Sequence, residues 1–193
     1  MPIRALRDNV FVRRRKAGER VGLLFIPESA REKTQEGVVV AAGAGARLKG
    51  HVIRPMSVKP GDRVLFGKYP GEPAEIDGEL LVNIKEDDLF AVVEPDGTVR
   101  PLYDHVAIKR SATPESHDGL IYIPHTSQEL AYEGDVVAAG PGICNYKNGS
   151  WLSLSVKPGD HVLFGTKYAG QEVKVGAETL LLMRQAELAA VLE

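Results

Sequence analysis

The sequence has very little cysteine, few aromatic residues and no long hydrophobic run. The single cysteine, Cys144, excludes an internal disulfide framework and a zinc site built on paired cysteines. Aromatic residues make up 6% of the chain and the net charge is −2, whereas a nucleic-acid surface usually needs positive charge and exposed rings. No run is long enough to span a membrane. These absences favour a globular protein that has neither nucleic acid nor membrane as a partner.

Residue patterns typical of metal sites, cofactor sites and catalytic centres are also missing. The five histidines show no HxxxH or similar spacing, so we expect no metal. No Ser-His-Asp set or nucleophile elbow stands out, and Asp87 and Asp88 are interpreted as a solvated turn. The glycine-rich residues 43–45 suggest a phosphate-binding loop, but a third glycine and a following helix are absent, and a turn between strands explains them. We predict a protein that is not an enzyme and carries no cofactor.

An internal repeat dominates the rest of the sequence. The longest matching block differs at one position only, where Arg63 is replaced by His161. The separation between the copies grows from 96 residues to 99, which three one-residue insertions in loops explain. We predict two consecutive domains, residues 1–95 and 96–193. The main matching blocks are residues 58–67 with 156–165 and residues 36–45 with 133–142.

Each copy is rich in short β-type segments and poor in helical periodicity. Pro60-Gly61-Asp62 is a turn signal, because proline fixes φ and glycine accepts positive φ. Residues 85–88 fit a single helical turn. Many short strands separated by turns favour an all-β fold, a small barrel or sandwich, in each copy. In the first copy the predicted strands are residues 9–13, 37–42, 63–66, 79–84 and 89–94.

Two short apolar runs, residues 21–27 and 118–124, occupy matching places in the two copies. Each lies in a polar stretch that is too hydrophilic to bury a core of its own, which predicts a long mobile loop. An apolar tip on such a loop needs a partner surface. A buried strand bounded by glycine and proline fits the same runs, and the pattern alone does not decide between the two interpretations.

Taken together, these motifs resemble the GroES-type co-chaperonins, the small lids of the ring chaperonins. The resemblance covers both copies from end to end. It rests on Arg-x-Leu-x-Asp at each start, glycine before an apolar tripeptide and proline, Glu-Gly-x-Val-Val-Ala, Val-Lys-Pro-Gly-Asp and a closing Leu-x-Ala-Val. The tandem arrangement is similar to the double-domain chloroplast form. Leu23 and Leu120 depart from the family pattern, since many members have glycine there.

The resemblance implies two irregular β-barrels, each with a mobile loop that binds the chaperonin and a roof hairpin. The roof hairpins would be residues 46–55 and 143–154. Tyr69 and Tyr168 are implied to face the client chamber, although aromatics in matching places also fit a barrel core. The implied chaperonin-binding residues are Leu23, Leu24, Phe25 and Ile26 in the first copy and Leu120, Ile121, Tyr122 and Ile123 in the second.

The implied function is to cap a GroEL-type ring chaperonin loaded with ATP and to enclose an unfolded client protein, while the partner binds the ATP. Two other classes remain as alternatives. A dehydrogenase contains a related β-domain, but this chain has no room for a dinucleotide-binding domain. An oligonucleotide-binding barrel needs a basic face interleaved with aromatics. If Met1 is native, we expect no removed targeting segment and a bacterial or phage-encoded cytoplasmic protein; otherwise a chloroplast stroma fits.

The resemblance also indicates how a ring forms, because terminal strands of neighbouring subunits pair in the single-domain relatives. Residues 94–98 contain Pro-Asp-Gly, which predicts a tight turn and an antiparallel strand pair joining the two copies. Residues 2–6 and 189–193 are then edge strands, free to pair with other chains in a homo-oligomeric ring. The predicted interface residues are Ile3, Arg4, Leu6, Leu89, Val92, Val99, Leu102, Leu188 and Val191.

Overall fold

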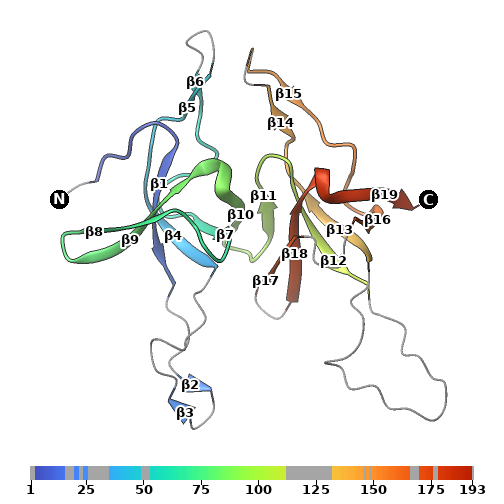
Figure 1. The fold of residues 1–193 in the computed structure, drawn as a ribbon, viewed down its shortest axis with the longest axis horizontal. Coiled ribbons are helices and arrows are strands. Elements are labelled where there is room, and N and C mark those ends of the chain that lie inside the picture. The colour runs from blue at the N-terminus through green and yellow to red at the C-terminus, as the bar shows by residue number, and fades with distance from the viewer. Residues whose placement is uncertain are drawn as a thin grey trace.

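The computed structural model shows two similar β-units, one after the other along the chain (Figure 1). We call strands β1–β10 the first half and strands β11–β19 the second half. The all-β prediction is confirmed. The structure describes residues 3–15, 20–21, 24–25, 35–48, 53–111, 132–145, 147, 149–165, 170–175 and 178–192.

The first sheet has seven strands in the order β11-β10-β7-β4-β1-β9-β8, and all neighbours are antiparallel. Side chains along β4 alternate between buried and half-buried, as expected for a strand with one face on a core. The last strand of the sheet, β11, comes from the second half. The strands are β1 (Asn9–Arg14), β4 (Glu36–Ala42), β7 (Arg63–Phe66), β8 (Glu72–Ile76), β9 (Glu79–Lys85), β10 (Leu89–Val93) and β11 (Val99–Pro101).

The second sheet repeats this order with one strand fewer, as β17-β18-β12-β13-β16-β19. Even an irregularity is repeated, because the register shifts between Phe11 and Val12 in β1 and between Ala107 and Ile108 in β12. The last strand, β19, stands where β10 stands in the first sheet. The strands of the second sheet are β12 (His105–Arg110), β13 (Glu133–Ala139), β16 (His161–Phe164), β17 (Gln171–Val175), β18 (Glu178–Arg184) and β19 (Leu188–Leu192).

Three small hairpins stand apart from the two sheets. Two of them rise from the same end of both halves and coincide with the predicted roof hairpins (Figure 1). The third lies at the opposite end of the first half. The hairpins are β5 (Ala46–Arg47) with β6 (Ile53–Arg54), β14 (Ile143–Cys144) with β15 (Trp151–Leu152), and β2 (Arg20–Val21) with β3 (Leu24–Phe25).

The turns follow the proline and glycine signals of the sequence. Gly61 has a φ of 95°, and Asp62 accepts a hydrogen bond from the Lys59 N–H at 2.9 Å, which confirms the predicted turn. Gly45 has a φ of 121°, and a Cβ there would lie 2.0 Å from the carbonyl oxygen of Arg54. Only glycine therefore allows the chain to enter the first roof hairpin so closely.

Within the described ranges, helix is limited to short 3₁₀ turns, and none is long and apolar enough to cross a membrane. The helical turn predicted at residues 85–88 is confirmed as η3 (Glu86–Asp88), and η5 (Gln185–Glu187) is its counterpart. The sequence analysis missed β8 and β17. Both are rich in polar residues, and β8 contains Pro73, so these strands depend on pairing with β9 and β18 rather than on their own composition.

Two expectations about the sheets need correction. Neither sheet closes into a barrel over the residues described, because β8 and β11 end one sheet and β17 and β19 end the other. Residues 3–6 were expected to form a strand, but they are not in one. A strand needs a pairing partner, and the equivalent strand β11 has one only because β10 lies beside it.

Each half packs its own hydrophobic core, and a third core lies between them. The first core draws on β1, β4, β7, β9 and β10, and the second on their counterparts in the second half. Two residues of the second half, Leu102 and Tyr103, belong to the first core. The cores at the centre of the molecule therefore tie the two halves together.

Candidate functional site

The two segments predicted to bind the chaperonin leave their sheets at equivalent points. In the first half the Arg15 N–H donates to the Glu36 carbonyl oxygen at 3.0 Å, and in the second half the Ser111 N–H donates to the Glu133 carbonyl oxygen at 3.0 Å. From these bases β4 and β13 run toward the roof hairpins. The predicted binding segments and the roof hairpins therefore belong to opposite ends of each half.

The first of these segments contains the hairpin β2–β3, in which Arg20 is paired with Phe25 and Val21 with Leu24. The hairpin is a sheet of its own and shares no strand with the seven-stranded sheet (Figure 1). Leu24 and Phe25 therefore lie on a strand outside the main sheet. Their predicted neighbours in binding, Leu23 and Ile26, lie outside the described residues, as do Leu120, Ile121, Tyr122 and Ile123 of the second half.

One of the two tyrosines predicted to face the client chamber lies in the described part of the chain. Tyr69 follows β7 and its side chain is 85% exposed. This exposure excludes the alternative that Tyr69 is a core aromatic residue. Tyr168 lies outside the described residues.

The two halves are joined by the tight turn that the sequence predicted. The Gly97 N–H donates to the Glu94 carbonyl oxygen at 2.9 Å, and the Thr98 N–H donates to the Asp96 carboxylate at 2.8 Å. The latter bond lowers the pKa of Asp96. Gly97 has a φ of 89°, which suits glycine. β10 and β11 are therefore an antiparallel pair, with Val93 opposite Val99 and Val92 opposite Arg100.

An apolar core fills the space behind this strand pair. It combines residues of β7, β10 and β11 with residues of β12, β17 and β18, so both halves contribute to it. We call this core, together with the β10–β11 pair, the internal junction. Such a shared core resists separation of the halves, because separation would expose apolar area at roughly 25 cal/mol per Å². Its buried members are Leu65, Ala91, Val93, Val99, Ala107, Val173, Leu180 and Leu182.

Tyr103 belongs to the second half, but its side chain packs in the core of the first half. Its side chain is buried, with the Arg54 guanidinium 4.4 Å from the ring centroid, and it stacks against Trp151 with centroids 6.0 Å apart. The hydroxyl lies 3.4 Å from the Ser57 hydroxyl. A cation over a desolvated aromatic ring is stabilising by about 2 kcal/mol, so the contact with Arg54 helps to hold Tyr103 in place.

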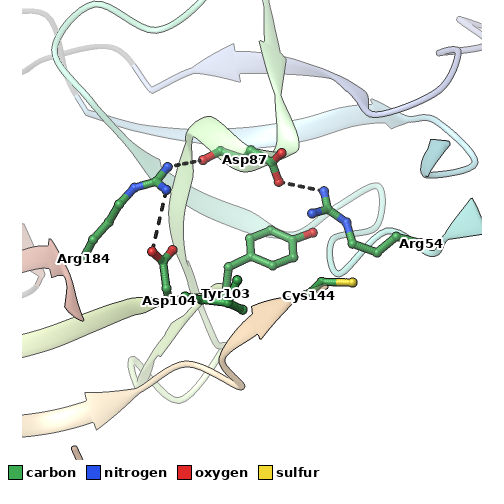
Figure 2. Close-up of a pocket in the computed structure, with 7 residues that line it drawn as sticks. Arg54, Asp87, Tyr103, Asp104, Cys144 and Arg184 are labelled. Carbon is green, nitrogen blue, oxygen red and sulfur yellow. Dashed lines mark hydrogen bonds and ion pairs between the residues drawn. The ribbon is translucent and has the colours of Figure 1, made fainter. Parts of the chain in front are cut away.

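Arg54 and Glu86 form a buried ion pair beside Tyr103, and we call these three residues the corner. The Arg54 Nη2 lies 3.3 Å from the Glu86 carboxylate. The same atom lies 2.7 Å from the Asp87 carboxylate (Figure 2). Glu86 also accepts the Ser57 N–H. Burial opposes the charge of Arg54, but the hydrogen bond to Asp87 and the nearby negative charges raise its pKa. Burial, together with a hydrogen bond to Glu86, raises the pKa of Tyr103. The arginine is therefore charged and the tyrosine neutral.

A cleft of about 350 Å³ opens beside the corner, between the two halves. Arg184 crosses it, donating to the Asp87 carbonyl oxygen at 3.3 Å and lying 3.7 Å from the Asp104 carboxylate (Figure 2). The hydrogen bond to Asp87 links the two halves, whereas the ion pair with Asp104 lies within the second half. Within the described ranges, no group of three His, Cys, Asp or Glu side chains could hold a metal ion. The cleft is lined by Arg54, Asp87, Tyr103, Asp104, Ile143, Cys144 and Arg184.

The predicted interface residues fall into two groups. Leu89, Val92, Val99 and Leu102 are buried at or near the internal junction. The others lie at the two outer ends of the molecule, where Leu6 and Val191 are exposed and Ile3 and Leu188 are half-buried. Arg4, like Leu6, is exposed in the N-terminal segment. The same set of repeat positions is therefore covered at the centre of the chain and uncovered at its ends.

Sequence reasoning missed the corner altogether and interpreted Asp87 as solvated. A usable signal was present in the repeat itself. Arg54 matches Leu152, Glu86 matches Gln185 and Tyr103 matches Arg7, so the corner residues are positions at which the two copies differ. Positions that differ between otherwise matching copies mark surroundings that differ.

Comparison with known proteins agrees with this two-unit structure. The family described as "Chaperonin 10 Kd subunit" matches the chain twice, at residues 2–93 and 98–192. The "20 kDa chaperonin, chloroplastic" of Spinacia oleracea is 33% identical over 194 residues, covering 98% of this chain and 75% of that protein. The matching protein of Arabidopsis thaliana is 31% identical over 194 residues.

Single-unit relatives match about half of the chain. The "Co-chaperonin GroES" of Novosphingobium aromaticivorans is 49% identical over 94 residues, which is 48% of this chain and 99% of that protein. The family match, the chloroplast relatives and the observed sheets all show the same doubled unit. The chain therefore belongs to the chaperonin 10 kDa family, as two consecutive GroES-like units of a co-chaperonin.

Proposed function

We propose that the chain caps a GroEL-type ring chaperonin through its two apolar loop segments and encloses an unfolded client beneath the cap. ATP is bound and hydrolysed by the ring, and this chain contributes binding alone. The observation that supports this most directly is the hairpin β2–β3, which places Leu24 and Phe25 on a strand outside the seven-stranded sheet. Leu23 and Ile26 complete the first binding segment, and residues 120–123 form the second.

The energetics of such a segment require several of them to act together. Burying one large apolar side chain contributes roughly 1.5–3 kcal/mol, and ordering a segment on binding costs about 2–5 kcal/mol. One segment alone is thus a weak ligand. Several segments on one assembly bind tightly, because the first contact raises the effective concentration of the others.

The test is a pull-down with a GroEL-type ring, with and without ATP, using the Phe25→Ser and Tyr122→Ser double variant. We expect the wild type to be retained in the presence of ATP and the double variant to be lost while keeping its circular dichroism spectrum. Retention of the double variant at the wild-type level would overturn the assignment. Its unfolding would instead favour the buried-strand interpretation.

We also propose that chains assemble head to tail through the ends left uncovered by the internal junction. β19 pairs with β16 on one side only within the described ranges, and we call its other side the open edge. The open edge and the N-terminal segment lie at opposite ends of the molecule (Figure 1). The segment at residues 3–6 of the next chain would pair with β19, as β11 pairs with β10.

One pair of leucines supports this assembly. Leu102 is 1% exposed because it enters the core of the first half, whereas its repeat counterpart Leu6 is 64% exposed. Within the described part of the chain, the second core has no residues in the places of Leu102 and Tyr103. Leu6 of another chain would fill that place. The resulting ring holds an even number of units, so it cannot match a sevenfold ring chaperonin unit for unit.

Three finer assignments complete the proposal. The unit boundary lies in the turn between residues 95 and 96. Tyr69 and Tyr168 face the client, so replacing both with alanine changes client folding and not ring binding. Relatives include chloroplast and bacterial proteins, and we place this chain in a bacterial-type cytoplasm or a chloroplast stroma.

A further inference from the structure

The corner at the internal junction has a counterpart at the open edge, and the two differ in chemistry. The strand registers set the equivalence, since β14–β15 pairs as β5–β6 does and β16–β19 pairs as β7–β10 does. Leu152 therefore occupies the place of Arg54, and Gln185 that of Glu86. The Ser155 N–H donates to the Gln185 side chain at 2.6 Å, as the Ser57 N–H donates to Glu86.

The counterpart corner is thus uncharged, and Leu152 is 60% exposed where Arg54 is 3% exposed. Ala186 replaces Asp87 beside it. At the internal junction Tyr103 contacts both Arg54 and Trp151. Among the residues that the structure describes, the second core has no member from a segment equivalent to that of Tyr103.

The residue that matches Tyr103 is Arg7, at the other end of the molecule. The two share an uncommon backbone shape, with φ of 58° at Arg7 and 53° at Tyr103. Both carbonyl oxygens accept a glycine N–H, from Gly45 at 2.9 Å and from Gly142 at 3.0 Å. Arg7 is exposed, whereas Tyr103 is buried. The backbone around Arg7 therefore already has the conformation that the backbone has at Tyr103, where the second half packs into the first core.

We propose that Arg7 of a second copy of this chain docks in the uncharged corner formed by Leu152, Ser155 and Gln185, and so selects the partner of the open edge. This inference rests on the proposed head-to-tail assembly. Each corner then holds one guanidinium. At the internal junction it belongs to Arg54 of the roof hairpin, and at the open edge it belongs to Arg7 of the second chain. The guanidinium stem packs on Leu152, and its N–H groups reach the Gln185 and Ser155 oxygens.

The test is a charge swap read by sedimentation velocity. Leu152→Arg puts a second guanidinium in a corner that has no carboxylate at positions 185 and 186, and like charges in close contact are strongly unfavourable. We expect the dissociation constant of assembly to rise on the order of tenfold or more. Adding Arg7→Tyr to the same chain recreates the arginine–tyrosine pair of the internal junction and should restore assembly.

Two controls separate this inference from the assembly itself. Thr179→Arg adds the same charge at an exposed position of β18, a strand separated from β19 by three strands of the sheet, and should leave assembly unchanged. Removal of β19 tests assembly as such. If removal dissociates the oligomer but Leu152→Arg does not, Arg7 does not occupy this corner. Failure of Arg7→Tyr to restore the Leu152→Arg chain would overturn the proposal equally.

Discussion

Strands β10 and β19 occupy matching places in the two halves, and only β10 has a further strand paired along its outer side within the described ranges. Val92 of β10 is 2% exposed because β11 lies beside it, whereas the matching Val191 of β19 is 42% exposed. The two residues are identical and their strands pair identically with β7 and β16. The neighbouring strand therefore decides whether these valines are buried. In the part of the chain that the structure describes, the open edge repeats the internal junction without the strand that corresponds to β11.

Of the variants that test this comparison, removal of the open edge should have the largest effect on assembly. Deletion of residues 189–193 takes away most of β19, so a second chain has no strand to pair with. We expect a folded chain that sediments as a monomer and no longer caps a ring chaperonin. Circular dichroism serves as the folding control. A truncated chain that still sediments as the full-length oligomer would show that β19 is not the interface.

Shortening the two matched leucines should separate stability from assembly. Leu102→Ala removes a buried side chain from the first core and should lower the free energy of unfolding by about 2–5 kcal/mol. Leu6→Ala changes an exposed side chain and should stay within roughly 0.5 kcal/mol, while weakening assembly. Urea unfolding and sedimentation measure the two effects.

Leu80→Ala is the matched control for Leu6→Ala, because Leu80 is exposed to a similar degree, 68% against 64%, but lies on β9. It should leave both stability and assembly unchanged. Equal loss of stability in the Leu102 and Leu6 variants would contradict the comparison.

The buried histidine at the internal junction should make stability fall in acid. The Nδ1 of His105 lies 2.9 Å from the Leu102 carbonyl oxygen, and burial lowers its pKa. As pH falls below about 6.5, the unfolded chain takes up this proton before the folded chain does, so the stability present above that pH is lost.

The repeat supplies the matched variant for this test. Asn9 is the counterpart of His105 and donates to the Leu6 carbonyl oxygen at 2.8 Å, so His105→Asn keeps a hydrogen bond but does not titrate. Thermal melting between about pH 7 and pH 5 should show a smaller loss in this variant. Equal slopes would mean that His105 does not titrate in this range.

The smallest effect on stability is expected for His161, which lies beside the open edge. Its pH dependence should have the opposite sign to that of His105. The hydrogen bond that the His161 ring donates to the Asp135 carboxylate at 2.7 Å, with Glu133 nearby, raises the pKa of His161. The stabilisation is therefore present below about pH 6.5 and is lost as pH rises through the raised value. His161→Arg restores the residue of the first half, where Arg63 lies 2.6 Å from Glu36, and should remove this pH dependence from the melting temperature.

The sequence by itself determined the doubled unit, most of the strands and the turns. These are local features, since alternating β-branched residues and Pro-Gly turns fix backbone conformation within a few residues. The turn at Gly97 and the 3₁₀ turn at residues 86–88 were predicted for this reason. The strands β8 and β17 were missed because pairing, and not composition, forms them.

The tertiary structure alone decided which matched positions are buried and how charges are paired. The corner of Arg54, Glu86 and Tyr103 joins residues far apart in sequence, and no local pattern encodes their meeting. Residues 3–6 read as a strand like β11 in sequence, yet only β11 has an edge to pair with. Strand pairing and burial depend on a neighbour, which sequence periodicity cannot supply, so the difference between the internal junction and the open edge belongs to the tertiary structure.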